Sequence, residues 1–421
     1  MKVRSERGFA LFFEIAGIVI VLAVLGFVWT RIHDKANRPL QAVNTTKPSD
    51  NIYSRQFSRG KCQGSGAVSF THLPLDLSDI GVILPYGGMT EAHVLPISHG
   101  YIYQVNPNAA SDTYPVYAIA DGYIVSVGHR SQHVGNSQSS RPTNDYQLYI
   151  EHSCTFYSYF DLLTSLSPDI ASKIDTSKAF DTEYVRIHVR AGQLIGRVGG
   201  QSVDFGVWNF EKPAAKFINP ASYKGDEERF YLDDMFSHFT DNLKAQLLTK
   251  DARIAEPRSG TVDYDVAGTL LGNWFQEGTG GFTGPASTHG ETNPQYWNGH
   301  LAIAYDSLDP SQIRFSIGNW GGKATQFGFV DNKPDPKNVD VSSGLVKIEL
   351  QKFQNYNRTT GGRWDITSGP IAEPGAQNSG AVQGTVLLQM LAANKLKLEA
   401  FPGLSADKVS GFTSAAKMYV R

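Results

Sequence analysis

Two stretches decide the fold of the first half of the chain: VYAIADGYIVSVG at residues 116–128 and VRAGQLIGRVGG at residues 189–200. Each is an apolar or alternating run interrupted by Gly or Asp, a pattern typical of short β-strands joined by tight turns. YQLYIEHSC at residues 146–154 has the same character. From these runs we predict a β domain over residues 61–225.

Residues 226–255 change the period of the apolar pattern. Their apolar side chains recur at intervals of three and four, with polar residues between them, which predicts an amphipathic helix linking two bodies. The residues that set this spacing are Leu232, Met235, Phe236, Phe239, Leu243 and Leu247.

Residues 256–421 return to β-type runs, such as LAIAYDSL at 301–308 and GTVLLQML at 384–391. They predict a C-terminal antiparallel β-barrel or sandwich, so the chain as a whole should be mainly β. Gly272 stands two residues before Trp274. This Gly-x-Trp resembles the start of lipocalin-like barrels, in which the Trp closes the barrel floor.

The N-terminal segment GFALFFEIAGIVIVLAVLGFVW at 8–29 is long enough to cross a bilayer and ends without a small-residue cleavage site. We predict a single-pass transmembrane anchor over residues 1–30 and a polar linker over residues 31–60. The bulk of the chain would then be extracytoplasmic, with the membrane as its first partner. Basic residues flank the apolar run on both sides, so charge does not fix its orientation.

Composition excludes several classes of function. The chain has 421 residues, more than one typical domain, and a formal net charge of -2, so nothing in its overall charge favours nucleic acid. Two cysteines exclude a disulfide-rich scaffold and a Cys-based zinc site. Outside the cytoplasm, Cys62 and Cys154 could form a disulfide; the alternative is a pair of buried thiols.

Four features follow one another in a fixed order: PISHGYIY at 96–103, the run at 116–128, YQLYIEHSCTFYSYFDLL at 146–163, and VRAGQLIGRVGGQSVDFGVWN at 189–209. This order resembles the lysostaphin-type (LytM-like) zinc peptidases, which cut peptide crosslinks in bacterial cell walls. The resemblance covers residues from about 85 to 210. It implies an antiparallel β domain of the duplicated-hybrid-motif type.

The resemblance also shows which catalytic groups are replaced. His99 matches the first zinc ligand of the family, but the Asp ligand four residues later is Tyr103. One catalytic His position is Tyr159, and the final His-x-His is Ser202-Val203-Asp204, which places Ser202 at the position of the base and Asp204 at that of the last ligand. One of three ligands and neither catalytic histidine remain, so the domain is expected to be a pseudoenzyme without a resident cofactor.

Two other uses of this region remain open. A rearranged zinc site could use histidine and carboxylate ligands; its candidates are His93, His99, His152 and Asp204. The alternative for these histidines is hydrogen bonding within the fold. An aromatic groove could bind glycan or peptide; its candidates are Tyr101, Tyr103, Tyr157, Tyr159 and Trp208.

These observations lead to three functional hypotheses. The first is a membrane-anchored binding, scaffold or regulatory module at the cell envelope, with cell-wall peptide or glycan, or an envelope protein, as its partner. The second is a metal-dependent cell-wall peptidase with rearranged ligands. The third is a carrier of a small apolar ligand in the C-terminal β domain.

Overall fold

The computed structural model describes residues 61–134, 142–175, 181–284, 296–357, 360–365 and 374–421. Within these ranges no helix is both long and apolar enough to span a membrane. The predicted anchor and linker, residues 1–60, lie outside them.

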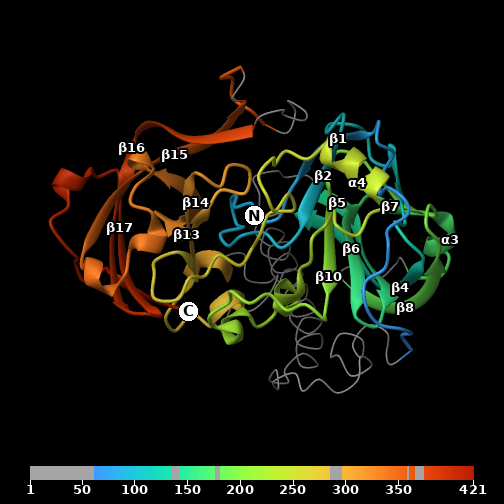
Figure 1. The fold of residues 1–421 in the computed structure, drawn as a ribbon, viewed down its shortest axis with the longest axis horizontal. Coiled ribbons are helices and arrows are strands. Elements are labelled where there is room, and N and C mark those ends of the chain that lie inside the picture. Colours follow the sequence, from blue (N-terminus) through green and yellow to red (C-terminus); the bar gives the residue numbers. More distant parts are fainter. Residues whose placement is uncertain (1–60, 135–141, 176–180, 285–295, 358–359, 366–373) are drawn as a thin grey trace, which may run out of the picture.

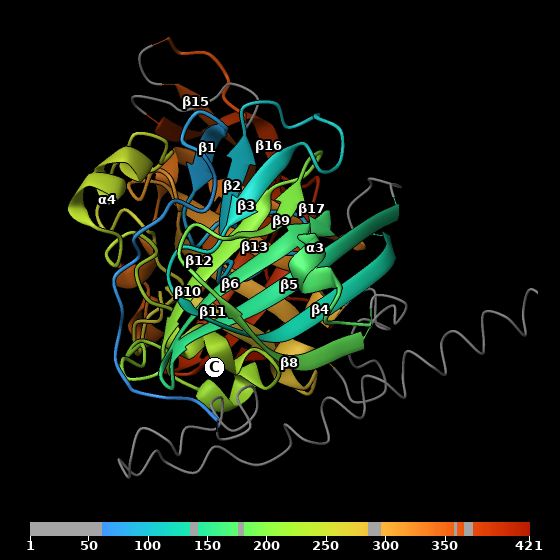
Figure 2. The same cartoon turned by 90° about the vertical axis from the view of Figure 1, so that its right-hand side faces the viewer.

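The first body contains a seven-stranded antiparallel sheet and a smaller three-stranded sheet (Figures 1 and 2). The large sheet has the order β1 (Ile80–Leu84), β2 (Gly100–Gln104), β10 (Val203–Asn209), β6 (Phe156–Leu163), β5 (Pro142–Ser153), β4 (Gly122–Val134), β8 (Asp181–Val189). The small sheet consists of β3 (Tyr114–Tyr117), β9 (Leu194–Val198) and β7 (Ser165–Leu166). The short helix α3 (Pro168–Ala171) follows β7 in the chain. The two stretches that predicted this body supply parts of β3, β4 and β9.

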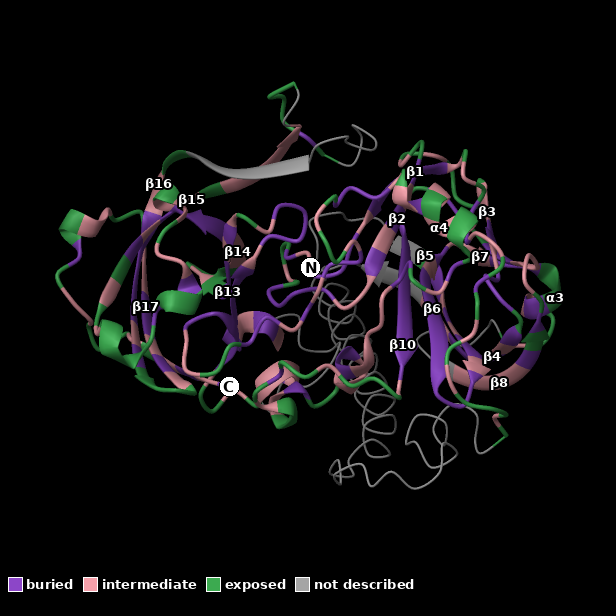
Figure 3. Ribbon diagram, viewed as in Figure 1, coloured by how far each residue is buried: buried purple, intermediate pink, exposed green. Residues whose placement is uncertain are grey.

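The large sheet is covered on both faces, and Figure 3 shows β6 and β10 buried along their length. Side chains of a strand alternate between the two faces. On β6, Phe156 and Phe160 join the main hydrophobic core, whereas Tyr157 and Tyr159 join a separate aromatic cluster. The second face, which carries Tyr159, is called the site face below.

The segment after β10 corrects one prediction. Instead of a helix over residues 226–255, it forms the 3-10 helix η3 (Glu227–Tyr231), an irregular stretch, and the helix α4 (Asp241–Leu248). Met235, Phe236 and Phe239 belong to the main core of the first body. Backbone bridges to Phe70 and Trp208 hold the irregular stretch against the sheet, so these apolar residues are buried without a continuous helix.

The C-terminal half is a closed eight-stranded antiparallel barrel, which confirms the β-barrel prediction. Its strands are β11 (Gly272–Gln276), β12 (His300–Tyr305), β13 (Ile313–Trp320), β14 (Lys323–Phe329), β15 (Val346–Asn357), β16 (Pro374–Ala392), β17 (Lys395–Pro402) and β18 (Lys417–Val420). Short 3-10 helices connect the elements; they are η2 (Pro220–Tyr223), η4 (Gly281–Thr283), η7 (Tyr296–Gly299), η8 (Val330–Asn332), η9 (Pro336–Asn338), η10 (Val341–Ser343) and η12 (Ala406–Lys408).

Large apolar side chains fill the barrel. Trp274, Phe315, Phe329 and Leu350 are fully buried within one cluster. At one end the Arg421 guanidinium lies 4.0 Å from the centroid of the Trp274 ring and donates hydrogen bonds to the carbonyls of Val266, Thr269 and Leu271. A packed interior with a sealed floor gives no support to the carrier hypothesis.

The outer wall of the barrel packs against the first body. Ala302 and Ala304 of β12 face outward into the core of the first body. Arg314 of β13 donates a hydrogen bond to the Met89 carbonyl at 2.6 Å. The β15–β16 hairpin extends from the barrel towards the first body (Figure 1), and Trp364 beyond β15 is buried against Val82.

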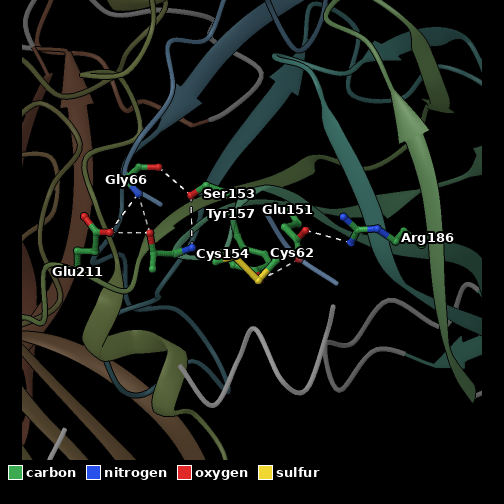
Figure 4. The surroundings of a disulfide bond; sticks show 9 residues. Cys62, Gly66, Glu151, Ser153, Cys154, Tyr157, Arg186 and Glu211 are labelled. Atoms are coloured by element: carbon green, nitrogen blue, oxygen red, sulfur yellow. Dashed lines mark hydrogen bonds and ion pairs between the residues drawn. A yellow bond between two sulfur atoms is a disulfide. The ribbon is translucent and has the colours of Figure 1, made fainter. Parts of the chain in front are cut away.

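Of the two alternatives for the cysteines, the structure contains the Cys62–Cys154 disulfide, with Cα atoms 5.0 Å apart. Figure 4 shows the chain after Cys62 held on the β5–β6 turn by several hydrogen bonds. The Gly66 amide donates to Thr155 Oγ1 at 2.8 Å, and Ser153 Oγ donates to the Gly66 carbonyl at 2.8 Å. The disulfide therefore fastens the start of the described chain to the large sheet.

Candidate functional site

His99 and Asp204, two of the candidate metal ligands, contact each other. Asp204 lies on β10 opposite Tyr101 of β2, and His99 directly precedes β2. His99 Nε2 is 3.2 Å from Asp204 Oδ2. Burial lowers the pKa of His99 to about 3. Burial and the nearby Asp161 raise the pKa of Asp204 well above its usual range. Burial therefore disfavours the charged form of each of these two groups.

Two further residues, Tyr103 and Ser202, lie close to Asp204. Burial and Asp204 raise the pKa of Tyr103 to about 12, so its phenol keeps its proton. Ser202 Oγ is 3.3 Å from Asp204 Oδ1 and donates a hydrogen bond to it. Neither a protonated phenol nor a serine hydroxyl is among the usual zinc ligands, which are thiolate, imidazole and carboxylate groups.

Tyr159 belongs to a buried network of charged and polar side chains that could not be predicted from the sequence. Tyr159 donates a hydrogen bond to Asp161 Oδ2 at 2.6 Å, and Gln147 Nε2 donates to the same oxygen at 2.9 Å. Arg130 forms ion pairs with both Asp161 and Asp145. Burial opposes the ionisation of Asp161, but the Arg130 guanidinium and these hydrogen bonds lower its pKa. The sequence feature that points to this network is Asp161, which stands two residues after Tyr159 and therefore lies on the same face of β6.

The four candidate metal ligands do not converge. His93 and His99 have ring centroids 6.2 Å apart. His152 is instead on the core face of the sheet, where Nε2 is 2.9 Å from Ser158 Oγ and its ring packs against Phe70 and Phe156. Across the described ranges, no group of three or more His, Cys, Asp or Glu side chains is placed to hold a metal ion. The structure therefore gives no support to a metal site built from all four residues.

The predicted aromatic groove divides into three parts. Tyr159 and Trp208 line a pocket of about 270 Å³. Tyr101 and Tyr103 form a neighbouring pair with ring centroids 6.1 Å apart. Tyr157 is fully buried and donates a hydrogen bond to Glu151, so its role is in packing.

The pocket has walls from four parts of the chain. The site face supplies Tyr149, Tyr159 and Trp208, the connecting segment supplies Asp226, Glu228 and Arg229, and the barrel supplies Phe282, Tyr296 and His300. The loop before β2 completes it with residues that include His93 and His99. The barrel's contribution could not be predicted from the sequence, because it depends on how the two bodies dock.

Arg229, the arginine among the described residues that line the pocket, is already paired. Arg229 is buried, with Nε 2.5 Å from Asp226 Oδ2, and its Nη1 donates to the Pro96 carbonyl. Burial and the neighbouring Asp226 raise the pKa of Glu228 to about 8, so its carboxyl is mostly protonated at neutral pH. The pocket is thus polar and aromatic, but close to uncharged.

The buried His300 should make stability depend on pH. Burial lowers its pKa from 6.5 to about 4. The unfolded chain therefore binds a proton at a pH where the folded chain does not. The free energy of unfolding should fall as pH decreases from 6.5 to 4, by up to about 1.4 kcal/mol per pH unit from this group.

His300→Gln should give a shallower pH dependence, because Gln does not titrate and still offers an N–H to the Phe282 carbonyl, the partner of His300 Nε2. Urea unfolding across this pH range measures the slope, with the exposed His188→Gln as the matched control. Equal slopes in the two variants would contradict the assignment.

Among solved structures, the chain is similar to the NMR solution structure of lysostaphin, at 11% sequence identity and a TM-score of 0.22. The match covers 84% of this chain and 92% of that chain. No protein-family model matches the chain, and no curated protein matches it.

Proposed function

We propose that this protein is a non-hydrolytic binding or scaffold module of the cell envelope, held at the membrane by its N-terminal segment and exposed outside the cytoplasm. One observation carries the proposal: the residues at the family's metal and base positions bond to one another instead of presenting ligands. His99 contacts Asp204, Ser202 donates to Asp204, and Tyr159 donates to Asp161. A groove that lacks hydrolytic groups can still bind a ligand through the side chains that line it.

Two further features support the proposed compartment. The Cys62–Cys154 disulfide is the kind of bond that persists in oxidising surroundings. The apolar run at 8–29 has the length of a membrane span. The partner class, cell-wall peptide or glycan, follows from the resemblance of the first body to wall peptidases.

Metal analysis combined with a wall-hydrolysis assay tests the proposal. The full chain, purified in detergent, should contain far less than one zinc per molecule, should sediment with purified cell-wall sacculi, and should release no soluble fragments from them. Adding a chelator should leave both sedimentation and thermal stability unchanged, because no structural metal holds the site.

The competing outcome is a peptidase with rearranged ligands. Stoichiometric zinc, lost together with wall hydrolysis in His99→Ala but retained in His188→Ala, would overturn the proposal. Failure to sediment with sacculi would also count against it.

A further inference from the structure

The pocket between the site face and the barrel presents aromatic rings from both bodies. On the site face, Tyr149 stacks against Trp208 with ring centroids 5.1 Å apart. On the barrel, Phe282 and Tyr296 have ring centroids 5.8 Å apart. Tyr149, Phe282 and Tyr296 are only half-buried, so each can offer part of its ring to a bound molecule.

The polar groups of the pocket suit a ligand without charge. Arg229 is paired with Asp226, so it supplies no unpaired charge to a ligand. Polar side chains that line the pocket include Ser98, Tyr149 and Glu228. A charged ligand would lose its hydration here without gaining an opposite charge, whereas hydroxyl and amide groups would find hydrogen-bonding partners.

One edge of the large sheet, at β1, is also closed to an extended peptide. Peptides often bind by adding a strand to an open sheet edge. The β1 edge of the large sheet is already paired with the chain after α4: the Ile83 amide donates to the Lys250 carbonyl at 2.8 Å, and the Ala252 amide donates to the Ile83 carbonyl at 2.9 Å. The pocket volume of about 270 Å³ is below the usual range for ligand sites, roughly 300–1,000 Å³, and suits one compact unit.

We propose that this pocket binds a single neutral sugar unit of a glycan, with the ring stacked between Tyr149 on the sheet and Phe282 and Tyr296 on the barrel. The inference rests on the proposed function and specifies its ligand: the glycan, not the peptide, of the cell wall. Because both bodies contribute to the pocket, the sugar would contact them simultaneously.

Calorimetric titration of the full chain in detergent with three probes tests this inference. The probes are a neutral N-acetylglucosamine oligomer, its deacetylated cationic form, and a cell-wall stem peptide. The neutral oligomer should bind, and the other two should bind at least tenfold more weakly. Tighter binding of the cationic oligomer or of the peptide, or no binding of any probe, would overturn the inference.

Substitutions of aromatic residues test where the oligomer binds. Tyr296→Ala and Tyr149→Ala should each raise the Kd for the neutral oligomer roughly tenfold, the value of one lost ring contact. The matched control Tyr356→Ala removes a half-buried tyrosine that does not line the pocket.

Oligomer binding that neither ring substitution weakens would overturn the location. The sacculus experiment separates the two proposals. Sedimentation with sacculi that the neutral oligomer does not compete away would contradict the sugar site and leave the binding function standing.

Discussion

Arg130→Met is expected to lower the free energy of unfolding by about 3–5 kcal/mol, the range found when one partner of a buried ion pair is removed. Arg130 Nη2 is 2.7 Å from Asp145 Oδ1, and the same guanidinium also pairs with Asp161. The side chains of Asp145 and Asp161 are 0% and 7% exposed. Removing the guanidinium would leave two buried carboxylates without a cation.

Urea unfolding at pH 7 measures this effect. The matched control is Lys395→Met, which breaks the solvent-exposed pair with Glu277 and should cost less than about 1 kcal/mol. Adding Asp145→Asn and Asp161→Asn to Arg130→Met should restore part of the loss. If Arg130→Met behaves like the Lys395 control, the network does not stabilise the fold as described.

The double substitution Cys62→Ser and Cys154→Ser should cost about 4 kcal/mol. The bridge joins positions 92 residues apart, and a loop of that size strongly restricts the unfolded chain in the chain-entropy account. It also holds the segment that hydrogen-bonds to Ser153 and Thr155.

The measurement compares denaturant midpoints of wild type and the double variant, each with and without reductant. Reductant should bring wild type to the level of the double variant and leave the variant itself unchanged. A wild-type midpoint insensitive to complete reduction would show that the bridge adds little to stability.

The sequence predicted the strands well because their signals are local. The stretches at 116–128 and 189–200 combine alternation with Gly turns, and most of their residues lie in strands or in the turns beside them. The Gly-x-Trp motif was also informative: Trp274 is fully buried at the floor of the closed barrel. Neither inference required knowledge of distant contacts.

The predictions that failed depended on tertiary context. Met235 and Phe239 have helical spacing, yet they lie in an irregular segment and are buried in the core of the first body. His152, named as a candidate ligand, is instead hydrogen-bonded on the core face, in agreement with the alternative given for these histidines. Arg130 lies far from Asp161 in sequence, and only the pairing of β4 with β5 and of β5 with β6 brings them together.

Closure of the barrel has a consequence for the kinetics of folding. Phe275 of β11 pairs with Val420 of β18, so the first strand of the barrel finds one of its partners only in the last. Contacts this distant in sequence require a large loss of chain entropy before they stabilise the structure, so barrel closure should be a slow, late step. Until then β11 has an open edge and Trp274 lacks the cover of Arg421, so a chain arrested at this stage should be the species most prone to aggregate.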